Sequence, residues 1–296
     1  MPEFQPLDVS DSQFINSILK NNNTSSCEYC FGNIYPYLAV MDIEYAYVSS
    51  CLIIKCIVSD GLYYMFPAGK GDVKSALDFL VEDAEKSGLP SRIYAVSREN
   101  AELFRSIYGE KFKINENRDS FDYIYNSSDL INLSGKKYQP KRNHISYFKR
   151  NFNWKYEKLS ADNIPQCLEM SNKWLENQKE SPLYDELVRE NKIIRLFFKE
   201  FSSMDCIGGV IKIDGEVVAY TVGERLNSET FCLHFEKAYS HIRGAYPMIN
   251  QQFAENELSG YLYINREEDT GAENLRKAKL SYHPAFLLEK YEIIIR

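Results

Sequence analysis

Apolar and polar residues alternate along the chain in a pattern that predicts a mixed α/β protein. Runs rich in Val, Ile and Tyr indicate strands, and apolar residues spaced three and four apart indicate helices. Asp60-Gly61 is a strong hairpin signal between two such strands. The elements predicted for the first half are strands at 38–49, 51–58 and 62–66, a helix at 73–84, a strand at 92–96, a helix at 101–107, and strands at 112–114 and 121–125.

The second half repeats this order of elements. A second hairpin signal stands at Asp214-Gly215, and Val96-Ser97-Arg98-Glu99 corresponds to Ile264-Asn265-Arg266-Glu267 at a strand end. We therefore expect two copies of one α/β (α+β, mixed-sheet) unit. The predicted elements are strands at 209–213, 217–223 and 230–235, a helix at 246–258, a strand at 261–264, a helix at 271–279, and a strand at 286–295.

Composition narrows the class of protein. The chain has 296 residues, and 35 Lys and Arg against 42 Asp and Glu give a net charge of −7, which disfavours a nucleic-acid binder that is basic throughout. Seven scattered cysteines suit reduced thiols in a cytoplasmic protein. Cys27 and Cys30 have the spacing of a zinc half-site or a redox pair, but no second pair follows, so we expect no metal. We expect neither a signal peptide nor a transmembrane segment.

The order of elements resembles the GNAT acyltransferase fold. A tandem pair resembles the Fem-type aminoacyltransferases and the C-terminal domain of bacterial phosphatidylglycerol lysyltransferases (the DUF2156 group). The segment 275–284, LRKAKLSYHP, is similar to the lysyltransferase pattern L-R-x-[YF]-K-x-K-F-x-P, from which Ala278 and Ser281 depart. The segments 136–144 and 235–238 add to the likeness. The resemblance implies GNAT-like domains at 1–135 and 159–296, joined by a basic linker at 136–158.

In GNAT domains the helix after the meander begins at a loop that binds a pyrophosphate, and the resemblance extends that role to residues 241–246. A helix N-terminus offers free N–H groups to a phosphate. The alternative is that Arg243-Gly244 is only a turn. The candidate donor-binding residues are His241, Arg243, Gly244, Ala245 and Tyr246, with Lys279 added by the motif.

The basic linker is a second candidate. It holds eight Lys or Arg, Lys141 and Arg142 among them, and one acid, Glu157. Such a cluster attracts a polyanion such as tRNA, and interleaved aromatic residues can stack on bases. The alternative is a solvated helix whose aromatic residues pack against both domains.

Acid–base candidates lie on one predicted strand. His234 and Glu236 are two apart and are expected to face the same side. Glu236 is the preferred base and His234 the next, and the GNAT resemblance makes Tyr282 a candidate acid. A core histidine and a structural glutamate are the alternatives. Asp269 is a candidate for binding a substrate ammonium, although acids before a helix also complement its dipole.

Three functions remain open. The first is a GNAT-type acyltransferase that moves an acyl or aminoacyl group from a coenzyme A thioester to an amine or hydroxyl. The second is an aminoacyl-tRNA-dependent transferase acting on a lipid head group or a peptide. The third is a non-catalytic domain that binds a nucleotide or a protein partner. We expect the donor in the second half, near Arg243 rather than Lys70, with the first half forming a wall for the acceptor.

Overall fold

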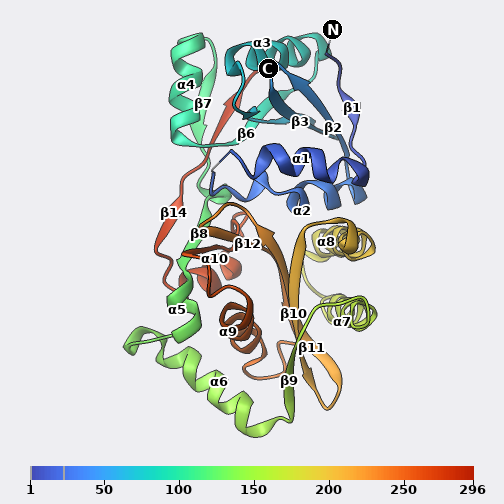
Figure 1. The fold of residues 1–296 in the computed structure, drawn as a ribbon, viewed down its shortest axis with the longest axis vertical. Helices are drawn as coiled ribbons and strands as arrows, with labels where there is room; N and C mark the ends of the chain where they lie inside the picture. The colour runs from blue at the N-terminus through green and yellow to red at the C-terminus, as the bar shows by residue number, and fades with distance from the viewer. Residues whose placement is uncertain (1, 23) are drawn as a thin grey trace.

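Two mixed sheets, one above the other in Figure 1, organise the chain. The computed structural model describes residues 2–22 and 24–296. The first sheet has the order β1-β2-β3-β4-β6-β15-β7, with β5 paired to β3. Its strands are β1 (Gln5–Pro6), β2 (Asp42–Val48), β3 (Cys51–Val58), β4 (Gly61–Met65), β5 (Ala68–Gly69), β6 (Ser91–Val96), β7 (Lys113–Glu116) and β15 (Tyr291–Ile294).

The second sheet has the order β14-β8-β13-β12-β11-β10-β9. Its strands are β8 (Asp122–Asn126), β9 (Trp154–Lys158), β10 (Cys206–Ile213), β11 (Glu216–Arg225), β12 (Thr230–Ala238), β13 (Tyr263–Asn265) and β14 (Phe286–Leu288). The α-helices are α1 (Ser12–Leu19), α2 (Phe31–Ile34), α3 (Val73–Ser87), α4 (Arg98–Tyr108), α5 (Ser127–Asn132), α6 (Gln139–Asn151), α7 (Ile164–Glu176), α8 (Tyr184–Lys199), α9 (Ala245–Glu257) and α10 (Glu273–Leu280).

The predicted repetition is confirmed in the order of the elements. In each sheet an antiparallel meander leads through a helix to a strand that pairs in parallel, β4 with β6 and β12 with β13. α3 is amphipathic, begins at the Asp72 cap and ends at Gly88, whose φ of 70° suits glycine. The mixed α/β class is therefore confirmed.

Two strands cross between the sheets, which the sequence did not indicate. β8, expected to close the first half, pairs with β13 and β14 in the second sheet. The final strand, expected to be continuous from 286 to 295, divides into β14 in the second sheet and β15 in the first. The break places Lys290 in the interior, where its ammonium lies 2.7 Å from both Glu28 and Asp122.

The segment 136–158 is part of the second unit. Most of it is helix α6, which packs on α9, and the remainder includes the edge strand β9. Its aromatic residues Tyr138 and Phe148 are fully buried in the core of the second sheet. The helix agrees with the alternative interpretation of the linker, but these aromatic residues pack into the second unit alone and not against both domains. Helices α7 and α8, which no sequence signal placed, cover the opposite face of the second sheet (Figure 1).

One of the three apolar cores is shared by both halves. It joins Phe31 and Ile54 from the first half to Phe197 and Tyr220 from the second. The other two cores lie under α9 and between α3, α4 and the first sheet. The shared core and the crossing strands hold the sheets together, so the groups between them are fixed relative to one another.

Candidate functional site

A β-bulge in β12 separates two side chains that the sequence placed together. Val222 pairs with Phe235 and Gly223 with Leu233, so His234 is the extra residue. The alternation of sides reverses there, and Glu236 turns toward α9 while His234 turns toward α2 and α8. The expectation that His234 and Glu236 share one face is therefore wrong.

Glu236 forms a buried polar group with residues from β13 and α9. One carboxylate oxygen accepts from Arg266 Nη2 at 2.9 Å, and the other accepts from Asn250 Nδ2 at 3.1 Å. Within the described residues, Arg266 Nη1 and Asn250 Oδ1 are buried without a hydrogen-bond partner. Buried polar atoms are rarely left unpaired, so this donor and this acceptor point to a ligand.

Tyr282 and Lys141 adjoin this group. The Arg266 guanidinium lies 4.9 Å and the Lys141 ammonium 3.9 Å from the centre of the Tyr282 ring. Burial, with the nearby charge of Arg266, lowers the pKa of Lys141 to about 8. Its ammonium also lies 2.7 Å from Ser281 Oγ. A pKa of about 8 makes Lys141 a candidate base, whereas burial raises the pKa of Tyr282, which weakens it as an acid.

The strands around this group leave a gap in the backbone ladder. β12 pairs with β13 only at Thr230, Phe231 and Cys232, and then continues to Ala238. Beyond that point Arg266, which directly follows β13, bridges to Glu236 through side chains. We call Glu236, Asn250, Arg266, Lys141 and Tyr282 the Arg266 site.

The predicted phosphate loop is partly covered. The α9 N-cap, Gly244, has a φ of 92°, and a Cβ there would lie 2.5 Å from the carbonyl oxygen of His144 in α6. Pro247 supplies no N–H, and the N–H groups of Ala245 and Met248 donate to backbone carbonyls. At most the N–H of Tyr246 remains for a phosphate in the first turn.

The side chains of that loop also have partners. Arg243 lies over the ring of Tyr147 at 4.4 Å, and the rings of His241 and Tyr239 lie 5.3 Å apart. His241 and Arg243 are exposed. These residues form a surface beside α6 and do not join the Arg266 site.

Two candidates from the motif have structural partners. Asp269 is fully buried and accepts two hydrogen bonds from Arg276 at 2.8 Å and one from Tyr123. Although burial opposes it, these bonds hold the pKa of Asp269 well below its usual range. The buried Lys279 donates to the carbonyl oxygens of Arg266 and Glu268. Asp269 and Lys279 thus both have internal partners in the structure, and binding of an ammonium by Asp269 or an anion by Lys279 stays a prediction.

Arg142 likewise acts within the fold. Its guanidinium donates to the carbonyl oxygens of Leu133 and Gly135 and to Gln139 Oε1. These bonds fix the start of α6, so Arg142 is not free for a polyanion. Lys141, its neighbour, is the linker residue that reaches the Arg266 site.

His234 lies on the other face of β12, between two carboxylates. Its Nδ1 is 2.9 Å from Glu267 and its Nε2 is 3.3 Å from Glu224. Burial alone would lower the pKa of His234, but Cys232 and the two carboxylates outweigh burial and raise it. This pairing fits the alternative of a satisfied interior histidine.

Comparison with known proteins now places the chain. The family described as "Phosphatidylglycerol lysyltransferase, C-terminal" matches residues 20–294. The chain therefore belongs to that family, which supports an aminoacyl transferase without fixing the donor. No helix in the described ranges is long and apolar enough to cross a membrane.

Solved structures agree with this placement. A conserved protein of unknown function from Bacteroides thetaiotaomicron is 35% identical with a TM-score of 0.92, each chain covering 100% of the other. A lysylphosphatidylglycerol synthetase C-terminal domain from Agrobacterium fabrum has 13% identity and a TM-score of 0.69, covering 98% of this chain and 93% of its own. A tandem GNAT protein from the clavulanic acid pathway has 8% identity and a TM-score of 0.52, covering 100% and 99%. The predicted tandem GNAT-like fold is thus confirmed.

One curated relative matches a smaller part. An uncharacterised protein of Mycoplasmoides gallisepticum is 24% identical over 179 residues, or 58% of this chain and 55% of that protein. The chain thus spans about half the length of that relative.

Two members of the Arg266 site, Asn250 and Arg266, were not predicted as site residues. Asn250 lies inside an apolar helix pattern, and Arg266 was noted only as part of a repeated strand end. A polar residue on an otherwise apolar helix face was the available signal for Asn250. Arg266 had no comparable signal, because its partner Glu236 is brought near by the bulge.

Proposed function

We propose that the protein transfers an aminoacyl group from an aminoacyl-tRNA ester to an acceptor hydroxyl or amine at the Arg266 site. The observation that carries the proposal is Arg266 Nη1, which has no hydrogen-bond partner among the described residues. Glu236 holds the guanidinium through Nη2, beside Lys141, whose pKa is lowered to about 8. Family membership supports aminoacyl transfer. A lipid head group such as phosphatidylglycerol is the first acceptor to test, because the family description names it.

Each residue has a distinct part in the reaction. The Arg266 Nη1–H donates to the ester carbonyl oxygen, where negative charge develops as the acceptor attacks. Neutral Lys141 takes the proton from the attacking O–H or N–H. The carbonyl carbon forms its new bond, its bond to the ribose oxygen breaks, and the Lys141 ammonium returns the proton to that oxygen. Glu236 and Asn250 act as positioning residues for Arg266.

The donor assignment rests on the α9 junction. Coenzyme A would need free N–H groups for its pyrophosphate, and Pro247 together with the internal bonds of Ala245 and Met248 leaves few. A tRNA acceptor end is a larger polyanion that can instead contact exposed cations, including Lys149 and Arg150 of α6. The covered junction thus supports the ester donor over the thioester.

The test is a donor and acceptor screen on the purified chain. Radiolabelled aminoacyl-tRNAs are offered with phosphatidylglycerol vesicles or with an amine-bearing peptide, and acetyl-CoA is offered in parallel with the same acceptors. We expect transfer from tRNA and its loss in Lys141→Met. The matched control is Lys86→Met, an exposed lysine of α3 in the first half, which should transfer normally. Transfer from acetyl-CoA alone would overturn the donor assignment, and no transfer from any donor would overturn the enzyme proposal.

A further inference from the structure

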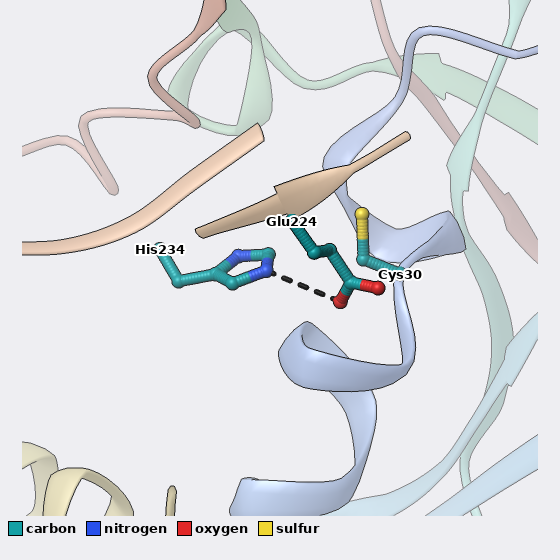
Figure 2. Close-up of side chains that lie close together, drawn as sticks. All are labelled: Cys30, Glu224 and His234. Carbon is teal, nitrogen blue, oxygen red and sulfur yellow. Dashed lines mark hydrogen bonds and ion pairs between the residues drawn. The ribbon is translucent and has the colours of Figure 1, made fainter. Parts of the chain in front are cut away.

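A buried cluster of soft and hard metal ligands lies on the opposite face of β12. Cys30 directly precedes α2, Glu224 lies near the C-terminal end of β11, and His234 is the bulged residue of β12 (Figure 2). One ligand atom from each lies within 4.8 Å of the other two. Three elements far apart in sequence therefore converge on one point.

We propose that Cys30, Glu224 and His234 bind a zinc ion. A thiolate, an imidazole and a carboxylate are the ligand types that zinc takes in proteins, most often in tetrahedral geometry. With bonds of about 2.0–2.1 Å to oxygen and nitrogen, two tetrahedral ligands stand about 3.3–3.4 Å apart. His234 Nε2 and Glu224 Oε1 are 3.3 Å apart, a separation that suits two ligands of one ion.

The second nitrogen of His234 has the partner that a zinc-bound histidine requires. Its Nδ1 lies 2.9 Å from Glu267 Oε1, the distance of a normal hydrogen bond. Metal-bound histidines usually donate their other N–H to a carboxylate, which fixes the tautomer and the ring orientation. Glu267 is thus a positioning residue, itself held by the Asn33 amide at 2.9 Å.

Gly32 packs closely against the proposed ligands. A Cβ at Gly32 would lie 2.7 Å from Glu224 Oε1, 2.9 Å from Cys206 Sγ and 3.2 Å from His234 Nε2. A side chain at this position would therefore collide with the ligands, and the Gly32 N–H donates to Glu224 Oε1 at 2.6 Å. A water can fill the remaining coordination position.

A second cluster of one thiol and two carboxylates in the described residues already has a counter-charge. Cys27, Glu28 and Asp122 also lie within ligand distance of one another. There the Lys290 ammonium already occupies the centre, 2.7 Å from both carboxylates and 3.4 Å from the Cys27 sulfur. At Cys30, Glu224 and His234 the described residues place no lysine or arginine within ion-pair distance. The two cysteines of the CxxC spacing thus enter different clusters.

An imidazolium between Glu224 and Glu267 is the competing account. It would neutralise the carboxylates, and the Cys232 thiol already donates to Glu267 Oε1 at 3.8 Å, but it gives no role to the thiol of Cys30 beyond its contact with Cys232. Zinc binding would displace the thiol proton of Cys30 to solvent and leave His234 neutral. The ion would tie the segment before α2 to the second sheet, a structural role apart from the Arg266 site.

Metal analysis of the full chain tests the proposal. The protein is stripped with a chelator and titrated with Zn²⁺ against a colorimetric competitor. We expect one equivalent bound, a higher melting temperature with zinc, and no response to Mg²⁺. X-ray absorption should show sulfur at about 2.3 Å and nitrogen or oxygen at about 2.0–2.2 Å. Absence of zinc binding by the wild-type chain would overturn the proposal.

Variants then locate the ion. Cys30→Ser and His234→Gln should lose the zinc equivalent, while Cys56→Ser, a buried thiol in the first sheet, should retain it. Glu267→Gln should weaken binding about 10–100-fold. If a ligand variant fails to fold, Co²⁺ bound to the wild-type chain still reports a thiolate ligand through its charge-transfer absorption. Loss of zinc in Cys232→Ser but not in Cys30→Ser would place the ion on the Nδ1 side of His234 and refute this ligand set.

Discussion

β4 and β12 hold the same position in the two halves but end differently. β4 pairs in parallel with β6 from Leu62 through Met65, its last residue. β12 leaves β13 after Cys232 and runs on to Ala238. The first half closes its parallel seam with backbone hydrogen bonds, whereas the second half closes it with the side chains of the Arg266 site. A duplicated order of elements therefore does not imply a duplicated site.

The arginines at the equivalent strand ends show the same difference. Arg98 lies on the surface, pairs with Glu289, and has a side chain that is 58% exposed. Arg266 pairs with Glu236 and has a side chain that is 13% exposed. The shared Arg-Glu dipeptide thus gives a solvated ion pair in one half and a desolvated donor in the other, where electrostatic interactions are stronger.

Lys290 lies where the last strand crosses between the two sheets, so its substitution tests how strongly the halves depend on each other. Lys290→Met removes the ammonium between Glu28 and Asp122 and leaves two buried carboxylates unpaired. We expect a loss of about 3–5 kcal/mol in the free energy of unfolding, measured by urea denaturation. The control Lys111→Met breaks an exposed pair with Glu85 and should cost about 0–1 kcal/mol. Equal losses would mean that the strand crossing does not depend on this cluster.

The difference between the two arginines can be tested directly. Arg266→Lys keeps the positive charge but lacks the fork that bonds Glu236 and presents Nη1. We expect aminoacyl transfer to fall about 10²–10³-fold, as for the loss of an oxyanion donor. The matched variant Arg98→Lys should change transfer little. Thermal unfolding of both variants checks that the fold is kept, and transfer by Arg266→Lys at the wild-type rate would remove Arg266 from the mechanism.

Lys141 gives the second half a pH dependence that the first half does not share. Because its pKa is lowered to about 8, the neutral amine that acts as base forms as the pH rises through 8. We expect the initial rate of transfer, corrected for spontaneous ester hydrolysis, to rise roughly tenfold from pH 7 to pH 9. Lys141→Met should flatten the profile. A profile unchanged in that variant would assign the titration to another group.

The contribution of Lys141 to the free energy of unfolding also rises with pH. A lysine with a folded pKa below its unfolded value binds fewer protons in the native state between those two values. Its protonation therefore opposes folding below about pH 8, and this penalty is relieved as the pH rises toward the unfolded value. The side chain is partly solvated, so solvent reduces the effect.

Local patterns in the sequence predicted most elements of both halves, including α3 and the meanders. They did not predict the crossing of β8 and β15, because pairing partners far apart in the chain leave no local signal. The bulge at His234 was equally hidden, since period-two alternation assumes an unbroken ladder. One extra residue reversed the side of Glu236, and with it the membership of the site.

The partners of the charged motif residues were hidden from the sequence for a different reason. Asp269 and Lys279 look available in a sequence, because their partners Arg276 and the carbonyl of Arg266 become neighbours only through the turn before α10. Lys141 was placed in a polyanion-binding linker, and only burial against Tyr282 makes its amine a candidate base. The sequence shows that a charged residue is present, but only the folded structure shows whether its charge is free to bind a ligand.

The last comparison concerns the loops that precede α3 and α9. From sequence, the donor was expected in the second half, near Arg243 rather than Lys70. In the structure Arg243 is exposed and stacked on Tyr147, beside a helix start that α6 covers. With an ester donor bound at the Arg266 site, Arg243→Glu should raise the apparent KM for tRNA at most about threefold, consistent with a surface charge worth under ~1 kcal/mol. Lys70→Glu should leave it unchanged. A loss of a hundredfold or more in Arg243→Glu, with Lys70→Glu unaffected, would return the donor phosphates to the α9 junction and favour coenzyme A.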